Sequence, residues 1–471
     1  MKAVAGLHYS SLVEIAGELR SRTLSPVELT RALLTRIERL NPELGAYYRV
    51  FADEALARAR EAEAEIGRGE WRGPLHGIPI AFKDLFNLGP TTAGSPLLAA
   101  NVAGKEAKLV RRARVAGAVI MGKLATHEFA LAAASLADQF PPARNPWDPE
   151  RTPGGSSTGA GTALAAGMAF GAFGTDTGGS VRLPAAYCGI VGYKPTFGLL
   201  SRTGIIPLSP SLDHAGTVAR TVADAAALAE AVAGHDPSDP GSNPRAAKVI
   251  TAGLETGLRG LRVAVPRDLW DEASDPSVSE KVEAALDRLS GLGAEVSDVK
   301  LGVSIVQVMA VGYVITLAEA AAHHLPNLRH RTSPDYGREF GLVLRAGLLV
   351  PAHSYVHAQN ARVRIARKAA HLLENHDVLA MPTVGALADP LPPGPRPLNR
   401  RISEKPVPQY TWLANLTGGP AVSVPCGFSG SGLPVGLQLV GRPLNDATVL
   451  RAAHAYESAA EWRDMHPPAW P

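Results

Sequence analysis

Residues 151–189 read RTPGGSSTGAGTALAAGMAFGAFGTDTGGSVRLPAAYCG and combine two glycine-flanked serine turns with a run of small apolar residues between them. The turns contain Ser156 and Ser180. Because glycine adopts positive φ and allows close approach of the backbone, a serine after a glycine pair can present its hydroxyl beside free N–H groups. Such a turn can supply a nucleophile and an oxyanion hole together. The stretch therefore predicts nucleophilic attack on a carbonyl group.

The base for this serine has to come from outside the stretch. Ser180 is not in a G-x-S-x-G elbow, because the residue two places after it is Arg182. Lysine is the alternative base. Lys83 is the single cation of the run GIPIAFKDL at residues 77–85, whose apolar character is typical of a buried strand. Burial disfavours the charged form, so a neutral amine becomes accessible near pH 7.

Three ordered motifs resemble the amidase signature family of serine hydrolases. They are G-I-P-I-x-x-K-D at 77–84, N-P-W-D-P-x-R-T-P-G-G-S-S-x-G at 145–159 and G-T-D-T-G-G-S-V-R-x-P-A-x-x-C-G at 174–189. Further matches lie at residues 122–123, 127–129, 192–196, 211–213, 420–427 and 432–438. The resemblance extends from about Ser10 to about Glu461, which is nearly the whole chain.

The resemblance implies a role for each residue of the site. Ser180 matches the nucleophile, Lys83 the base, and Ser156 a bridging serine that follows a cis peptide bond. Ser157 matches a second serine that helps to hold the lysine. The oxyanion hole is matched by the N–H groups of Thr177, Gly178, Gly179 and Ser180. Thr158 departs from the pattern, since many members have glycine there.

Other polar residues near these motifs are interpreted as supporting the structure. Asp176 and Arg182 flank the nucleophile and are expected to orient its turn by hydrogen bonds. His127 is expected to be structural, because a lysine–serine relay needs no histidine. The adjacent Asp213 and His214 resemble a catalytic pair in isolation but match a structural Ser-Leu-Asp motif of the family.

The expected fold class is α/β, a large single amidase-signature domain (1–471) with a central twisted mixed β-sheet covered by helices on both faces. Within it, residues 1–70 form N-terminal helices, 71–230 the catalytic core and 300–410 variable helices and a loop around the substrate pocket. Alternating patterns predict strands at 78–82, 118–122 and 169–175, a helix at 157–168, and paired strands at 421–426 and 434–441. Ser25 and Pro26 predict a capped helix that stops at Asn41-Pro42.

Composition narrows the function classes. The chain has 471 residues and a net charge of only +3, with scattered basic residues, so no nucleic-acid surface is expected. Cys188 and Cys426 are the only cysteines and lack metal-site spacing, so no metal and no cofactor are expected. The apolar stretch 303–322 contains Gln307 and Glu319, and we expect no membrane span there. A cytoplasmic enzyme follows, acting on a small molecule; a homodimer remains open.

Three functions remain. The first is a stand-alone amidase that hydrolyses carboxylic amide C–N bonds. The second uses the same site on carbamates (a urethanase), anilides or esters. The third is the ammonia-producing component of a tRNA-dependent glutamine amidotransferase. Pro408 stands where that component has a glutamine-binding aspartate, and its Arg-Tyr-Asp-Gly motif is absent around residues 328–331, so the first function is favoured. A non-catalytic relative conflicts with the complete set of site residues.

Overall fold

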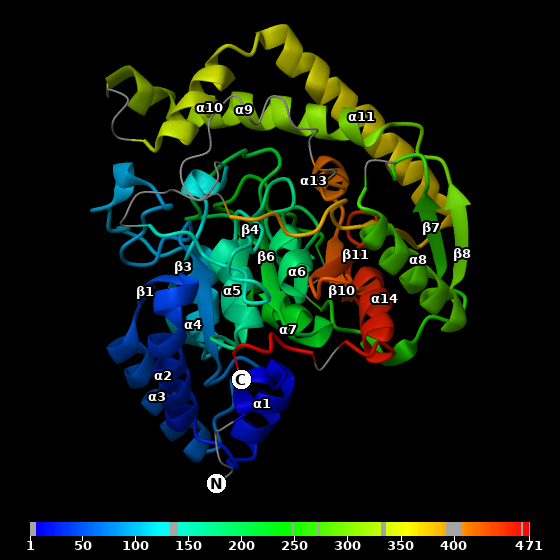
Figure 1. The fold of residues 1–471 in the computed structure, drawn as a ribbon. Helices are drawn as coiled ribbons and strands as arrows, with labels where there is room; N and C mark the ends of the chain where they lie inside the picture. Colours follow the sequence, from blue (N-terminus) through cyan, green and yellow to red (C-terminus); the bar gives the residue numbers. More distant parts are fainter. Residues whose placement is uncertain are drawn as a thin grey trace.

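The structure is a computed structural model that describes residues 6–131, 140–246, 249–270, 274–330, 336–391, 407, 409–462 and 465–470. Within them eleven strands form one mixed sheet in the order β1-β3-β2-β4-β6-β5-β10-β11-β9-β7-β8. Helices cover its two faces, and α9, α10 and α11 form a separate layer at the top of Figure 1. The single α/β domain and the mixed sheet confirm the expected fold class.

The strands are mostly short and fully buried in the middle of the sheet. Their bounds are β1 Tyr47–Val50, β2 Pro79–Lys83, β3 Val119–Leu124, β4 Gly171–Asp176, β5 Val191–Lys194, β6 His214–Ala219, β7 Arg262–Pro266, β8 Glu295–Val299, β9 Val378–Pro382, β10 Ala421–Phe428 and β11 Pro434–Val440. The predicted strands near 80, 120 and 172 and the predicted pair β10–β11 are present, the latter antiparallel. The sequence patterns did not predict β1, β5, β6 or β8.

The helices follow the strands as the alternating pattern predicts. Their bounds are α1 Leu12–Arg20, α2 Pro26–Leu44, α3 Ala52–Gly67, α4 Lys108–Val115, α5 Thr158–Ala165, α6 Arg182–Cys188, α7 Val222–Val232, α8 Pro276–Gly291, α9 Ile305–His330, α10 Arg338–Leu348, α11 Ala352–Asn375, α13 Trp412–Thr417 and α14 Asp446–Ser458.

The end predicted for α2 is wrong. Ser25 caps the helix by accepting hydrogen bonds from the N–H groups of Val27 and Glu28, as expected. However, the helix continues through Pro42 to Leu44 and ends at Gly45, which adopts a left-handed conformation with φ 62°. The Gly45 N–H then bonds to the Asn41 carbonyl oxygen at 2.8 Å. A glycine cap three residues later therefore outweighs the helix-stopping tendency of the proline.

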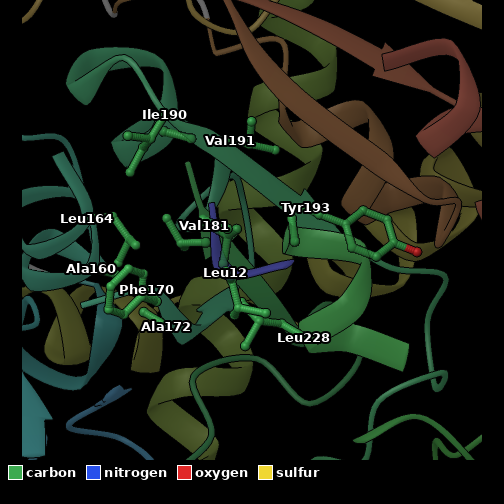
Figure 2. Packing of buried hydrophobic residues seen from close by; sticks show 14 of the residues in the cluster. Leu12, Ala160, Leu164, Phe170, Ala172, Val181, Ile190, Val191, Tyr193 and Leu228 are labelled. Carbon is green, nitrogen blue, oxygen red and sulfur yellow. The ribbon is translucent and has the colours of Figure 1, made fainter. Parts of the chain in front are cut away.

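The core beneath the serine turns is built from small and branched residues of α5, β4, β5 and α7. Figure 2 shows Ala160, Leu164, Phe170, Val181 and Leu228 packed together, and each of them is fully buried. At Gly161 in α5, a Cβ would lie 3.0 Å from both Cys188 and Pro184 of α6. Small residues therefore let α5 and α6, the two helices that begin just after the serine turns, pack closely.

Helix α9 is the most apolar long helix of the described residues. By length and composition alone, Ile305–Leu328 could cross a membrane. The polar residues Gln307 and Glu319 predict that it does not. Of its most apolar 18-residue segment, 44% is buried inside the protein. A buried helix of a protein core has the same composition, and α9 packs against α10, α11 and α13. The helices predicted for 300–376 are therefore present as one connected layer.

Candidate active site

The sheet brings Lys83 to the serine turns. Strand β2 ends at Lys83 and runs parallel to β4, which ends at Asp176, with Phe82 opposite Phe173. Because neighbouring parallel strands end at the same edge of a sheet, Lys83 lies beside Thr175. The Lys83 Nζ donates to the Thr175 hydroxyl at 2.8 Å and to the Ser156 hydroxyl, also at 2.8 Å. The predicted contact between Lys83 and Ser156 is thus present.

The environment of Lys83 favours its neutral form. The side chain is completely buried. Burial lowers the pKa of Lys83 to about 7, although the negative charges of Asp176 and Asp213 act in the opposite direction. Near neutral pH a large share of this amine can therefore accept a proton.

Ser156 is held from several sides. The Gly155–Ser156 peptide bond is cis, which confirms the expectation from the family pattern. A Cβ on Gly155 would clash with the ring of His127, so the imidazole packs directly on this peptide. The His127 backbone N–H also donates to the Ser156 carbonyl oxygen at 3.1 Å. His127 therefore supports the serine turn structurally, as predicted.

The second serine turn lies against the first. The Ser157 N–H donates to the Ser180 carbonyl oxygen at 3.2 Å. Ser156 is 2% exposed, whereas Ser180 is partly exposed. Within the described part of the chain no hydrogen bond joins the two serine hydroxyls, so a direct transfer of a proton between them stays a prediction.

Ser157 has a less direct role than the family pattern implied. Its hydroxyl donates to the Thr175 carbonyl oxygen at 3.3 Å. Among the described residues the lysine amine bonds to Thr175 and Ser156 instead. Thr175 is therefore a site residue that sequence reasoning missed. Its position just before Asp176, at the end of the strand predicted for 169–175, was the available signal, but its neighbour in the sheet was not predicted.

One of the four expected oxyanion donors is already occupied. The Gly179 N–H donates to Asp176 Oδ1 at 2.9 Å, and the Val181 N–H donates to Asp176 Oδ2 at 3.2 Å. The carboxylate therefore folds back onto the turn, which corrects the expectation for Gly179. In the described residues, the N–H groups of Thr177, Gly178 and Ser180 have no protein acceptor and remain candidate donors.

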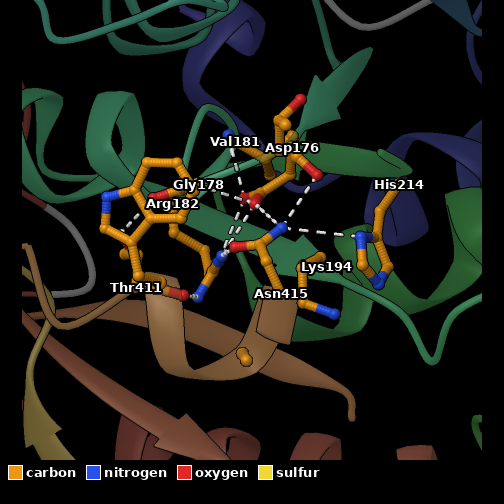
Figure 3. A network of polar contacts seen from close by, with 12 residues as sticks. Asp176, Gly178, Val181, Arg182, Lys194, His214, Thr411 and Asn415 are labelled. Carbon is orange, nitrogen blue, oxygen red and sulfur yellow. Dashed lines mark hydrogen bonds and ion pairs between the residues drawn. The ribbon is translucent and has the colours of Figure 1, made fainter. Parts of the chain in front are cut away.

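Asp176 and Arg182 form a fully buried ion pair with an N–O distance of 2.7 Å. Burial alone would raise the pKa of Asp176, but the charge and hydrogen bonds of Arg182 hold it well below its ordinary value. Figure 3 shows how Asn415 and Thr411 of the chain around α13 complete this network. Arg182 donates to the Asn415 side-chain oxygen at 2.7 Å and to the Thr411 carbonyl oxygen at 2.8 Å. The pair is thus hydrogen-bonded to the nucleophile turn, and its role in orienting Ser180 stays a prediction.

The adjacent Asp213 and His214 do not act as a pair. The Asp213 carboxylate accepts a hydrogen bond from the Thr177 hydroxyl at 2.6 Å. His214 is buried, its Nδ1 lies 2.7 Å from the Leu212 carbonyl oxygen, and burial lowers its pKa well below the ordinary value. Burial raises the pKa of Asp213 to about 6. The Ser-Leu-Asp segment thus supports the nucleophile turn.

A cavity of about 250 Å³ has Thr175 and Thr177 of the nucleophile turn among its lining residues, whereas Ser156 and Ser180 are not among them. Its walls are largely apolar, from Leu85, Ala130, Ile205, Ile206, Pro207 and Leu208, and Asp213 and Arg202 are among its polar lining residues. In the described residues no group of three or more His, Cys, Asp or Glu side chains could hold a metal ion. Together, a buried lysine of lowered pKa, two serines and unengaged N–H groups have the chemistry of a hydrolase that attacks carbonyl carbon.

Comparison with known proteins shows the family. The Amidase family model matches residues 28–450, so the chain belongs to the amidase family and is an amide-hydrolysing enzyme. It is 40% identical to an amidase of Pseudomonas putida, with 97% of each chain covered. It is also 40% identical to the A component of the glutamyl-tRNA(Gln) amidotransferase of Anaeromyxobacter sp. (strain K), with 95% of each covered.

A solved structure extends the comparison. The native peptide amidase from Stenotrophomonas maltophilia is 33% identical and superimposes with a TM-score of 0.80, covering 95% of this chain and 96% of that one. Relatives named as amidases and as amidotransferase components thus match this chain along nearly its whole length. Overall similarity therefore identifies the family and amide hydrolysis, and it does not distinguish between the substrates of these relatives.

Proposed function

We propose that the protein hydrolyses carboxylic amides by forming an acyl-enzyme on Ser180. The observation that carries this proposal is the fully buried Lys83 amine at 2.8 Å from the Ser156 hydroxyl, directly beside the turn that contains Ser180. A neutral lysine is a competent base, and a second serine can extend its reach.

The proposed reaction begins with proton transfer. Neutral Lys83 takes a proton from Ser156, which takes one from Ser180 as the Ser180 oxygen attacks the carbonyl carbon. The N–H groups of Thr177, Gly178 and Ser180 stabilise the negative oxygen of the tetrahedral intermediate. The relay returns the proton to the leaving nitrogen as the C–N bond breaks. Water then gives a proton to the relay and attacks the ester; the bond to the Ser180 oxygen breaks, the free acid leaves, and the relay returns the proton to the Ser180 oxygen.

The cavity next to the site supports a compact apolar group on the substrate. Its volume of about 250 Å³ and its walls of leucine, isoleucine, proline and alanine suit an aryl or short alkyl group. Carbamates, anilides and esters differ from amides only in the leaving group or the atom next to the carbonyl. A panel with one constant acyl group and alkylamine, aniline or alcohol leaving groups, together with a carbamate of the same aniline, would rank them by kcat/KM.

The amidotransferase component is the second candidate, because relatives named as such are up to 40% identical over nearly the full chain. The sequence departures at Pro408 and around Arg331 argue against it, and both residues lie outside the described part of the structure. Hydrolysis of simple amides by the purified single chain, without hydrolysis of glutamine, is expected if the stand-alone enzyme is correct. Activity on glutamine alone would favour the amidotransferase component.

Labelling and substitution test the assignment of the nucleophile. A fluorophosphonate probe should react with Ser180, located by mass spectrometry of the peptide. Ser180→Ala should lose about 10³-fold or more of kcat, since the covalent step is removed, while keeping its circular dichroism spectrum and melting temperature. Ser157→Ala is the matched control, with a smaller loss of about tenfold. An active Ser180→Ala protein would overturn the proposal.

We also propose that the enzyme works in the cytoplasm on a small-molecule substrate and that it binds neither nucleic acid nor a membrane. A homodimer is compatible with this proposal. Sedimentation velocity of the purified protein measures the oligomeric state directly.

A further inference from the structure

Glu319 of α9 accepts hydrogen bonds from two separate directions. From one side come the Ser209 hydroxyl at 2.7 Å, the Ser211 hydroxyl at 2.6 Å and the Ser211 N–H at 3.0 Å. From the other side come the Tyr355 hydroxyl at 2.9 Å and the Gln359 amide at 3.5 Å, both from α11. One carboxylate therefore joins the layer of variable helices to the loop at residues 208–213.

That loop ends at Asp213, whose carboxylate is the next member of the connection. It accepts hydrogen bonds from the N–H of Leu208 at 2.9 Å and from the N–H of Ser209 at 3.0 Å. It also accepts a hydrogen bond from the Thr177 hydroxyl at 2.6 Å. Thr177 lies three residues before Ser180, and its own N–H is a candidate oxyanion donor. Contacts thus run without a break from Glu319 through the loop and Asp213 to the nucleophile turn.

Ser209 is the buried point of this connection. Ser209 is fully buried, and Glu319 is the acceptor of its hydroxyl. If the carboxylate is removed, that hydroxyl loses its partner in a place that water does not reach, and such a group forces the local backbone to rearrange. Because the Ser209 N–H also bonds Asp213, a shift of this residue moves the acceptor of Thr177.

We propose that Glu319 is a positioning residue for the hydrolysis, resting on the function proposed above. It holds the loop at 208–213 so that Asp213 fixes the Thr177 side chain and with it the N–H groups of the nucleophile turn. Glu319 does not touch the substrate. Its effect is therefore on the transition state, where oxyanion donors act, rather than on ground-state binding.

The first test compares a variant that changes the Glu319 carboxylate with one that removes a hydrogen-bond donor to it from α11. Glu319→Gln removes the charge that organises the serine donors, and Tyr355→Phe is the matched control that removes one donor from α11 and leaves the loop contacts. With a small aryl amide, Glu319→Gln should lower kcat about tenfold and change KM by less than about twofold. Tyr355→Phe should change kcat by less than about twofold. Equal effects of the two variants, or a rise of KM alone, would overturn the proposal.

The second test asks whether Glu319 acts through Thr177. Thr177→Val keeps the backbone N–H and removes the hydroxyl that bonds Asp213. If both residues serve one connection, the double variant should be no more than about twofold slower than Thr177→Val alone. Multiplied losses would show that Glu319 acts by another route and would refute the inference.

Failure to fold has to be separated from failure to position. Circular dichroism and thermal melting are measured for each variant, and Ser209→Ala replaces Glu319→Gln if the latter does not fold, since it deletes the buried loop donor. The same loss of kcat is expected. If the probe labels Ser180 of the wild type but Ser209→Ala keeps the wild-type kcat, only this inference is overturned. If Ser180→Ala is active, the proposed function itself is overturned.

Discussion

Replacing Lys83 by methionine should remove activity and at the same time stabilise the protein near neutral pH. The pKa of Lys83 falls from its ordinary 10.5 to about 7 because the side chain is buried. One pH unit corresponds to about 1.4 kcal/mol, so the folded protein carries a penalty of about 4 kcal/mol at pH 7 relative to an unfolded chain with an exposed lysine. Methionine has a similar shape and no such penalty.

The sign of the pH dependence follows from the lowered pKa. Between about pH 7 and 10.5 the unfolded chain binds a proton that the folded protein does not, so the penalty falls as the pH rises. At pH 10 it is about 1 kcal/mol by the same arithmetic. The stability advantage of Lys83→Met over the wild type should therefore shrink by about 3 kcal/mol from pH 7 to pH 10. Hydrogen bonds lost with Ser156 and Thr175 are common to both pH values and cancel in this difference.

The assay is urea unfolding of both proteins at the two pH values, combined with the pH profile of wild-type kcat/KM. Because only the neutral amine can accept a proton, kcat/KM should fall about tenfold per pH unit below an apparent pKa near 7. A stability advantage that does not change with pH, or full activity at about pH 5, would refute the argument for a neutral buried lysine.

Lys123→Met is the matched control. Lys123 is also buried, but it forms an ion pair with Asp84 at 3.0 Å. Removing it leaves the Asp84 carboxylate unpaired in the core, which costs about 3–5 kcal/mol. This variant should therefore be destabilised at pH 7, the opposite of Lys83→Met.

Three further predictions concern other parts of the fold. Asp176→Asn breaks the buried pair with Arg182, so the melting temperature, measured by calorimetry, should fall. The kcat of amide hydrolysis should drop at least about tenfold. An unchanged kcat would mean that the pair does not shape the nucleophile turn. Burial raises the pKa of both Cys188 and Cys426, so neither thiol should react with a thiol reagent until the protein unfolds. Fast labelling of the native protein would contradict their burial. Ser11→Ala removes a capping box on α1, so stability should decrease by about 1 kcal/mol in chemical unfolding, and no change would show that the cap is dispensable.

The resemblance to the amidase signature family predicted Lys83, Ser156 and Ser180 as one group. The apolar run before Lys83 and the turns around the two serines are local patterns, and an α/β sheet was expected from alternating helices and strands. The structure places the lysine amine on Ser156 as that reasoning required. Their chemical roles remain predictions that the experiments above test.

Contacts between distant segments could not be read in the same way. The hydrogen bond between Lys83 and Thr175 depends on the register of β2 against β4, and the occupation of the Gly179 N–H depends on the direction of the Asp176 side chain. Similarly, the pairing of Glu319 with Ser209 joins residues that are far apart in the chain. Each of these follows from packing in three dimensions.

The amino-acid sequence by itself therefore determined the family and the α/β character and predicted which residues carry the chemistry, because these depend on the order of side chains along short segments. Only the tertiary structure decided which N–H groups of the turn are free, which hydroxyl holds the lysine and how the variable helices contact the site. The physical reason is that hydrogen bonds in a buried site are assigned by distance and direction, and these exist only after the sheet has brought its strands together.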